Sequence, residues 1–362
     1  MSEKLIVKNF GPIKHVELDI KKVNVLIGEQ GTGKSALVKL LNYLTNKNFL
    51  FGNKNYRKKE FEDNFFFRSD FFFDFVSPDF KIKYNIKEGF NIEFIGKNHN
   101  NLQRLSSLYK NFIEDHDLKY ENEYYSLSDW FNENVIRDIY VPAERIAITT
   151  MDSWTSNRDY LDSYVVKFFG NFHNAREKIT EFEIPHLNNV VYKREDQQDK
   201  VIFNGEEILL RRASSGFQSS IPLSIFVEYF ASLKERIRFI IEEPELNLFP
   251  TTQYELMKFL IEKTSQEKNG LFLATHSPYI LASINNLLLV GKYGNDKVDE
   301  VIPKKYWLDI NDVSAYMLLP NGEAEDIIDK ESGQIKAEKI DGASQIIGNE
   351  YEKIMNITYS QP

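Results

Sequence analysis

The amino-acid sequence predicts an α/β fold with a mixed, largely parallel sheet, an N-terminal antiparallel β part and a large α+β insert. Two observations carry this prediction. Toward both ends of the chain, short apolar runs alternate with segments of helical periodicity, and strands that alternate with helices usually pair in parallel. Between about residues 50 and 212 the pattern changes to hairpin signals mixed with helical stretches, which predicts the insert.

Composition narrows the classes of protein that the chain can be. Its 362 residues suffice for a sizeable buried core. Lys and Arg number 45 against 54 Asp and Glu, and this net charge of -9 argues against a dedicated DNA binder, although it leaves room for a local basic patch. The absence of cysteine excludes disulfides, thiolate metal sites and thiol nucleophiles. No apolar stretch has the length of a membrane span or signal peptide, so we expect a cytoplasmic protein without membrane contact.

The N-terminal segment contains three short runs typical of strands, followed by a helical pattern. The predicted strands are residues 5–7, 15–20 and 23–27, with a turn at residues 9–12. Beyond Ser35, Leu37, Leu40, Leu41 and Leu44 recur at the spacing of one helix face.

The insert contains two predicted hairpins. Apolar residues alternate over residues 80–86 and 90–94, on either side of Glu88-Gly89. The second hairpin joins residues 201–203 and 208–210 through Asn204-Gly205, which is the strongest short hairpin signal.

The C-terminal part returns to alternating helices and strands. We predict helices at residues 222–234, 252–267 and 344–355, and strands at residues 239–241, 271–274 and 315–319. The expected domains are a nucleotide-binding core of residues 1–50 and 205–300, an insert of residues 51–204, and a tail of residues 301–362 packed on the core.

Residues 28–35 fit the phosphate-binding loop pattern G-x-x-x-x-G-K-[ST], between a predicted strand and a predicted helix. Glycines let backbone N–H groups surround phosphates, and the helix N-terminus adds its positive dipole end. Lys34 would contact the β- and γ-phosphates of ATP, and the Ser35 hydroxyl would bind Mg²⁺. The predicted ATP-binding residues of this segment are Gly28, Gln30, Gly31, Thr32, Gly33, Lys34, Ser35 and Ala36.

Two adjacent carboxylates follow the apolar strand at residues 239–241. At the tip of a central strand, Glu242 could face Mg²⁺ while Glu243 acts as general base on the attacking water. Paired glutamates are also common on surfaces, but the position after an apolar strand and before Pro244 favours the catalytic interpretation.

Two further segments contribute residues to the predicted site. Ser214 and Gly216 lie in a small turn before a helix (the signature turn, residues 214–218), which could bind an anion or serve only as a helix cap. His276 follows the apolar strand of residues 271–274, where it could hydrogen-bond a γ-phosphate, although a lone histidine is usually structural.

The order of these features resembles the P-loop NTPase heads of the ABC type. EEPELNLFP at residues 242–250, THSP at 275–278, NFGPI at 9–13 and VPAER at 141–145 resemble the RecF and OLD branch, which includes ATPase subunits of bacterial anti-phage systems such as PtuA, GajA and AriA. The resemblance implies an ATPase in which Glu243 is the catalytic glutamate, His276 the switch histidine, and Ser214 and Gly216 the signature. It also implies a head-to-tail dimer, or higher oligomer, around ATP and Mg²⁺.

Several positions depart from that family pattern. Glu242 stands where most ABC proteins have Asp, and Phe217 replaces a glutamine of the signature. Gln103 is a poor match to the usual Q-loop glutamine, whose place the segment 141–145 could take. OLD proteins carry a nuclease domain after the head, and the 86 residues after His276 contain no matching acidic pair, so we expect none here.

We therefore expect a Mg²⁺-dependent ATPase that regulates a separate effector, a toxin or nuclease encoded nearby, in anti-phage defence. The alternative is a RecF- or SMC-like DNA clamp for DNA maintenance or repair, which the acidic net charge disfavours. A transporter subunit is a third interpretation, which the large insert disfavours.

Overall fold

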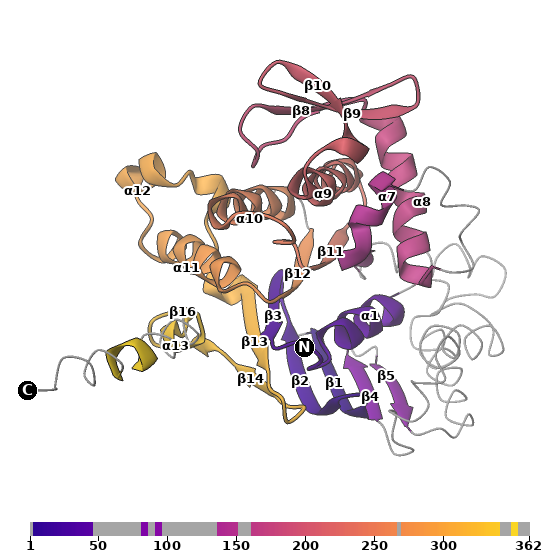
Figure 1. The fold of residues 1–362 in the computed structure, drawn as a ribbon. Helices are drawn as coiled ribbons and strands as arrows, with labels where there is room; N and C mark the ends of the chain where they lie inside the picture. The colour runs from indigo at the N-terminus through magenta and orange to yellow at the C-terminus, as the bar shows by residue number, and fades with distance from the viewer. Residues whose placement is uncertain are drawn as a thin grey trace, which may run out of the picture.

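The computed structural model describes residues 3–45, 81–85, 91–95, 136–150, 161–265, 269–340 and 349–353. Its centre is a six-stranded sheet in the order β14-β13-β3-β12-β11-β6, in which every pair is parallel except β13 with β14 (Figure 1). These strands are β3 (Val23–Gly28), β6 (Arg137–Val141), β11 (Ile237–Glu242), β12 (Gly270–Thr275), β13 (Val313–Leu318) and β14 (Ala324–Asp326). The predicted α/β fold with a largely parallel sheet is confirmed.

Helices cover both faces of this sheet. The long ones are α1 (Lys34–Leu44), α8 (Ser163–Lys178), α9 (Ser215–Ala231), α10 (Pro250–Ser265) and α11 (Pro278–Tyr293). Because side chains alternate along β11, Ile240 packs with α1 while Phe239 and Ile241 pack with α9, α10 and α11. The central sheet therefore separates two apolar cores, one on each side.

The N-terminal antiparallel part is a second sheet beneath α1. It has the order β2-β1-β4-β5 and consists of β1 (Glu3–Phe10), β2 (Ile13–Ile20), β4 (Lys81–Asn85) and β5 (Asn91–Ile95). The pairing of β4 with β5 confirms the first predicted hairpin.

A third sheet lies above α9 in the view of Figure 1 and adjoins the C-terminal end of α8. It is antiparallel in the order β10-β9-β8-β7, with β7 (Glu181–Glu183), β8 (Val190–Glu195), β9 (Gln198–Phe203) and β10 (Glu206–Leu209). Asn204 and Gly205 join β9 to β10 with φ of 52° and 81°, as the predicted hairpin turn requires.

The remaining elements are short. They are the helices α7 (Ala147–Thr150), α12 (Asp296–Val301) and α13 (Ala337–Ile340), the strands β15 (Ile328–Asp329) and β16 (Gln334–Ile335), and the 3₁₀ turns η3 (Ala143–Ile146), η5 (Leu210–Arg212), η6 (Lys304–Tyr306) and η7 (Ile310–Asp312).

The predicted start of α9 at Pro222 is wrong. The helix begins at Ser215, with Ser214 as its N-cap, and Pro222 lies inside it. Proline favours the first turn of a helix but tolerates the interior when packing holds the helix, and here Pro222 is buried between Ile221 and Leu223. The last predicted helix is described only over residues 349–353, and the rest of it lies outside the described residues.

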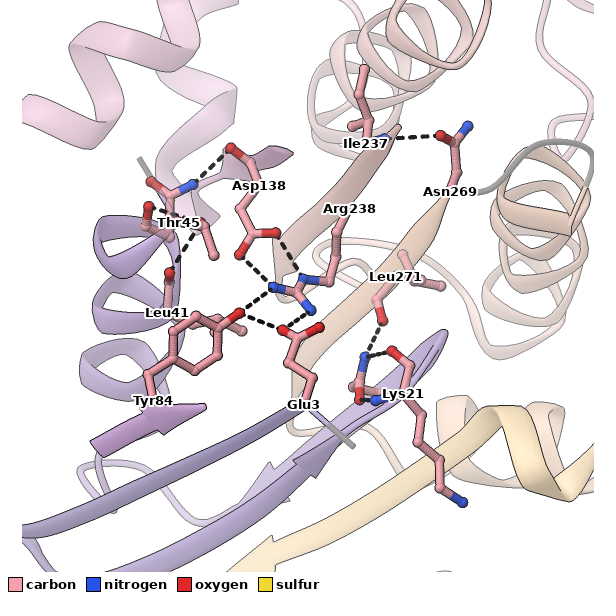
Figure 2. Close-up of polar contacts among 12 residues, drawn as sticks. Glu3, Lys21, Leu41, Thr45, Tyr84, Asp138, Ile237, Arg238, Asn269 and Leu271 are labelled. Carbon is pink, nitrogen blue, oxygen red and sulfur yellow. Dashed lines mark hydrogen bonds and ion pairs between the residues drawn. The ribbon is translucent and has the colours of Figure 1, made fainter. Parts of the chain in front are cut away.

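A buried polar network attaches the N-terminal sheet to the start of β11 (Figure 2). Arg238 donates two hydrogen bonds to Asp138 of β6, at 2.8 and 2.9 Å, and one to Glu3 of β1 at 2.6 Å. Tyr84 of β4 also donates to Glu3. The network thus fixes the end of β11 opposite to Glu242.

Among the described helices, none is long and apolar enough to cross a membrane.

Candidate functional site

The phosphate loop lies between β3 and α1, as predicted. Gly28 ends the strand and Gly33 caps the helix, with φ of 77° at Gly31 and 100° at Gly33. A Cβ at Gly28 would lie 2.6 Å from the Leu318 carbonyl oxygen, and one at Gly33 would lie 2.9 Å from Pro12. Left-handed backbone and close packing therefore both require glycine here.

The other residues of the predicted loop surround these glycines. Gln30 and Gly31 are exposed at the tip of the loop, whereas Thr32 is buried and its hydroxyl donates to the Glu29 carbonyl at 2.8 Å. Ser35 and Ala36 belong to the first turn of α1, with Ser35 exposed.

The Lys34 side chain folds back over this loop. Its ammonium group donates to the carbonyl oxygens of Gly28 at 2.8 Å and Glu29 at 2.9 Å, and only 7% of the residue is exposed. Burial lowers the pKa of Lys34, and nearby carboxylates oppose that shift. The cation is thus held where phosphates would meet the loop.

Glu242 and Ser35 form a pair suited to a divalent cation. The carboxyl group of Glu242 is buried, which raises its pKa, while the hydroxyls of Ser35 and Tyr140 lower it in part. Within the described part of the chain, Glu242 Oε1 has no hydrogen-bond partner. An unsatisfied buried carboxylate oxygen beside a hydroxyl fits Mg²⁺, which uses one or two protein oxygens and otherwise phosphates and water.

Glu243 leaves the strand in an unusual backbone conformation. Its φ is 44°, in the left-handed region, and its N–H donates to the Ala274 carbonyl at 2.8 Å. The Glu243 side chain is 36% exposed, and Oε1 lies 3.7 Å from Nε2 of His276. His276 Nδ1 in turn lies 3.5 Å from Nζ of Lys34. The structure therefore brings together Lys34, Glu243 and His276, which are far apart in sequence.

Sequence reasoning assigned no role to Glu245. Its Oε1 accepts from the Thr275 hydroxyl at 2.7 Å and from the His276 N–H at 2.9 Å. Glu245 thereby ties the segment after β11 to the turn after β12. The sequence feature that could have pointed to Glu245 is its position two residues after Glu243, the proposed base.

Arg145 ends the VPAER segment, and the sequence alone indicates no role for it. It lies after β6, the neighbour of β11, and is fully buried. Its guanidinium donates to the carbonyl oxygens of Glu242 at 2.8 Å and Glu243 at 2.6 Å. Gln103 lies outside the described residues.

The signature turn is not brought to the phosphate loop of the same chain. Ser214 caps α9 by accepting from the Phe217 N–H at 3.4 Å, so the cap interpretation holds for its hydroxyl. A Cβ at Gly216 would lie 2.9 Å from the Asn247 carbonyl oxygen. Ser214 is exposed, and α9 packs on the face of the sheet opposite to α1.

Sequence comparison relates this chain to known proteins. The family model described as AAA ATPase domain matches residues 1–148 and 149–281. A stretch of 88 residues is 36% identical to an OLD nuclease of Thermus scotoductus, and covers 24% of this chain but only 16% of that relative. The chain therefore corresponds to a small part of that protein's length.

Solved structures of SMC head domains are similar at low identity. One from Thermotoga maritima has 12% identity and a TM-score of 0.42, over 90% of this chain and 97% of that chain. One from Pyrococcus furiosus, with an extended coiled coil and bound to the C-terminal domain of ScpA, has 11% identity and a TM-score of 0.38, over 89% and 94%. Because the family match extends over residues 1–281, more than half of the chain, this protein belongs to the AAA ATPase domain family.

Proposed function

We propose that this ATPase domain hydrolyses ATP in a head-to-tail dimer and, through its ATP-dependent closure, regulates a separate effector protein. The observation that carries the proposal is the convergence of Lys34, Glu243 and His276 at the carboxyl edge of the parallel sheet. Ligands of open α/β sheets bind at this edge. The family match supports the ATPase part directly.

Each residue of the site has a distinct task in this proposal. The loop N–H groups and Lys34 bind the β- and γ-phosphates, for which Lys34 exchanges its present carbonyl partners. Glu243 takes a proton from water as the water oxygen bonds to the γ-phosphorus and the bond to the bridging oxygen of ADP breaks. His276, between Lys34 and Glu243, donates to a γ-phosphate oxygen.

Ser35 and Glu242 would hold Mg²⁺. When bound, the ion neutralises charge on the β- and γ-phosphate oxygens. The partnerless Oε1 of Glu242 supports this assignment, because a buried carboxylate oxygen is costly without a partner.

The second half of each ATP site would come from another copy of the chain. Ser214 is the N-cap of a 17-residue helix and Gly216 lies in its first turn, so the positive dipole end of the helix can bind a γ-phosphate there. Their position on the face opposite to α1 supports binding to a partner's nucleotide rather than to their own.

The proposed effector is a separate protein. The relative with 36% identity over 88 residues is named as a nuclease. The motifs at residues 242–250 and 275–278 resemble a branch that includes ATPase subunits of anti-phage systems. We therefore propose that the effector is a nuclease or toxin encoded nearby. The alternative partner is DNA, bound by the closed dimer as in a clamp.

The test is to trap the closed dimer. Glu243→Gln keeps the shape of the side chain but removes the base, which lowers turnover by roughly 10²–10⁴-fold. With Mg-ATP its mass in light scattering should double. Adding Ser214→Arg should abolish the increase, because the larger side chain crowds the γ-phosphate. Adding Ser232→Arg, at the exposed other end of α9, is the matched control and should preserve it.

Two outcomes would refute the shared site. If Glu243→Gln is a monomer without ATP, a mass that stays the same after Mg-ATP is added would refute the shared site. For a permanent dimer, the refuting result is an ATP off-rate equally slow with and without Ser214→Arg. Salt-dependent, ATP-dependent DNA binding without a co-purifying effector would favour the clamp instead.

A further inference from the structure

Arg145 carries a buried positive charge that no carboxylate pairs with directly in the described part of the chain. Burial lowers the pKa of its guanidinium to about 10, so it stays charged at neutral pH. An isolated buried charge is costly unless its donors are satisfied. An apolar side chain at this position would stabilise the core as well as the buried arginine does. The stability of the core therefore does not account for Arg145.

The partners of Arg145 are backbone carbonyl oxygens of three segments. Nη1 donates to Pro142 at 3.2 Å and to Glu242 at 2.8 Å, and Nη2 donates to Glu243 at 2.6 Å. Nε donates to Ser219 of α9 at 3.0 Å. A planar fork with fixed donors therefore joins the turn after β6, the end of β11 and the second turn of α9.

The Glu243 peptide is held from both sides. Its N–H donates to the Ala274 carbonyl, and its own carbonyl accepts from Arg145 at 2.6 Å and from the Leu246 N–H at 3.0 Å. A non-glycine residue with φ of 44° is strained and persists only where the surroundings hold it. Without Arg145, the chain at Glu243 could relax toward ordinary φ, which would move the carboxylate.

The same arginine reaches the helix that starts with the signature turn. Ser219 also donates through its hydroxyl to the carbonyls of Gly216, at 3.2 Å, and Leu246, at 2.6 Å. The first turns of α9 are therefore hydrogen-bonded to the segment around Glu243 in two ways, through Arg145 and through Leu246.

We propose that Arg145 is a positioning residue for hydrolysis: it holds the Glu243 peptide and couples it to the signature turn of its own chain. This inference rests on the proposed function, in which Glu243 acts on a chain's own ATP and the signature turn binds the partner's. Arg145 would then connect the two ATP sites of the dimer through one subunit, so that docking of the signature turn is sensed at Glu243.

The experiment compares Arg145→Lys with Arg137→Lys. Lysine keeps the charge but replaces the fork with a single point of donation. Arg145→Lys should lower kcat by about 10–100-fold, since small misplacements of a reacting group have effects of this size, and leave the KM for ATP within about threefold. The side chain of Arg137, at the start of β6, is 40% exposed and paired with Glu235, and its exchange for lysine should leave kcat unchanged.

A double variant separates positioning from general damage. If Arg145 acts through the Glu243 carboxylate, adding Arg145→Lys to Glu243→Gln should lower the residual kcat no further. A fully additive loss would overturn the inference. The inference would also be overturned if Arg145→Lys had the kcat of the wild type while Glu243→Gln was inactive. The proposed function would stand in that case. Full turnover of Glu243→Gln would overturn the proposed function, and the inference with it.

The concentration of ATP-binding sites is measured by titration with labelled ATP, and each kcat is calculated per binding site. Unfolded protein then does not lower the kcat. Should Arg145→Lys fail to fold, Ser219→Ala removes the hydroxyl bond to Leu246 and leaves Arg145 in place. It should lower kcat several-fold with unchanged KM, and an unchanged kcat would overturn the coupling.

Discussion

The stability of the protein should depend on pH through one buried histidine, His186. The residue is 4% exposed, and its Nε2 is hydrogen-bonded to the Ser220 hydroxyl of α9. Its Nδ1 is buried without a partner among the described residues, so a protonated ring would leave an unsatisfied N–H. Burial accordingly lowers the pKa of His186 from 6.5 to about 3.

The sign and size of the effect follow from this shift. Since the folded-state pKa lies below the unfolded value, the stabilisation is fully present above pH 6.5 and is lost as pH falls toward 3. At pH 5.0, which is 1.5 units below the unfolded pKa, about 2 kcal/mol is lost at 1.36 kcal/mol per unit.

Urea unfolding at pH 7.5 and pH 5.0 measures this loss. His186→Gln keeps a polar group near Ser220 but cannot be protonated, so its free energy of unfolding should fall by about 2 kcal/mol less than that of the wild type. His15→Gln removes an exposed histidine and is the matched control. Equal pH dependence of the wild type and His186→Gln would refute the reasoning.

Four further predictions concern the site and its support. Lys34→Ala should weaken ATP binding at least tenfold without unfolding the chain, because a charge-assisted hydrogen bond contributes about 1.5–3 kcal/mol; unchanged affinity in calorimetry would contradict the loop assignment. Ser35→Ala should raise the Mg²⁺ concentration needed for half-maximal turnover, which a Mg²⁺ titration measures. His276→Ala should slow hydrolysis and leave ATP affinity within a few-fold, and full turnover would mark the ring as structural. Arg238→Met should cost about 3–5 kcal/mol in urea unfolding, because it leaves the buried Asp138 unpaired, and an unchanged midpoint would show that the network does not stabilise the fold.

Local patterns were enough to predict the features whose physics is local. The glycine spacing of residues 28–35 determines a loop because glycine alone tolerates the φ of 77° at Gly31 and 100° at Gly33. Asn204-Gly205 predicts its hairpin because the two-residue turn needs positive φ at both positions, which asparagine and glycine tolerate. The continuous apolar runs of β11 and β12 predict strands buried on both faces, which is what the structure has.

The order of strands was decided only by the tertiary structure. Parallel pairing joins segments far apart in sequence, so no local pattern states that β13 lies beside β3, or that β6 lies beside β11. That order brings His276 between Lys34 and Glu243, and it places Arg145 under the Glu243 peptide. Burial of Pro222 within α9 is likewise a result of packing, which outweighs the local preference of proline for a helix start. The sequence by itself thus predicted which groups would carry the chemistry, while the sheet order determined which of them meet, because hydrogen-bonded pairing of strands is independent of their distance along the chain.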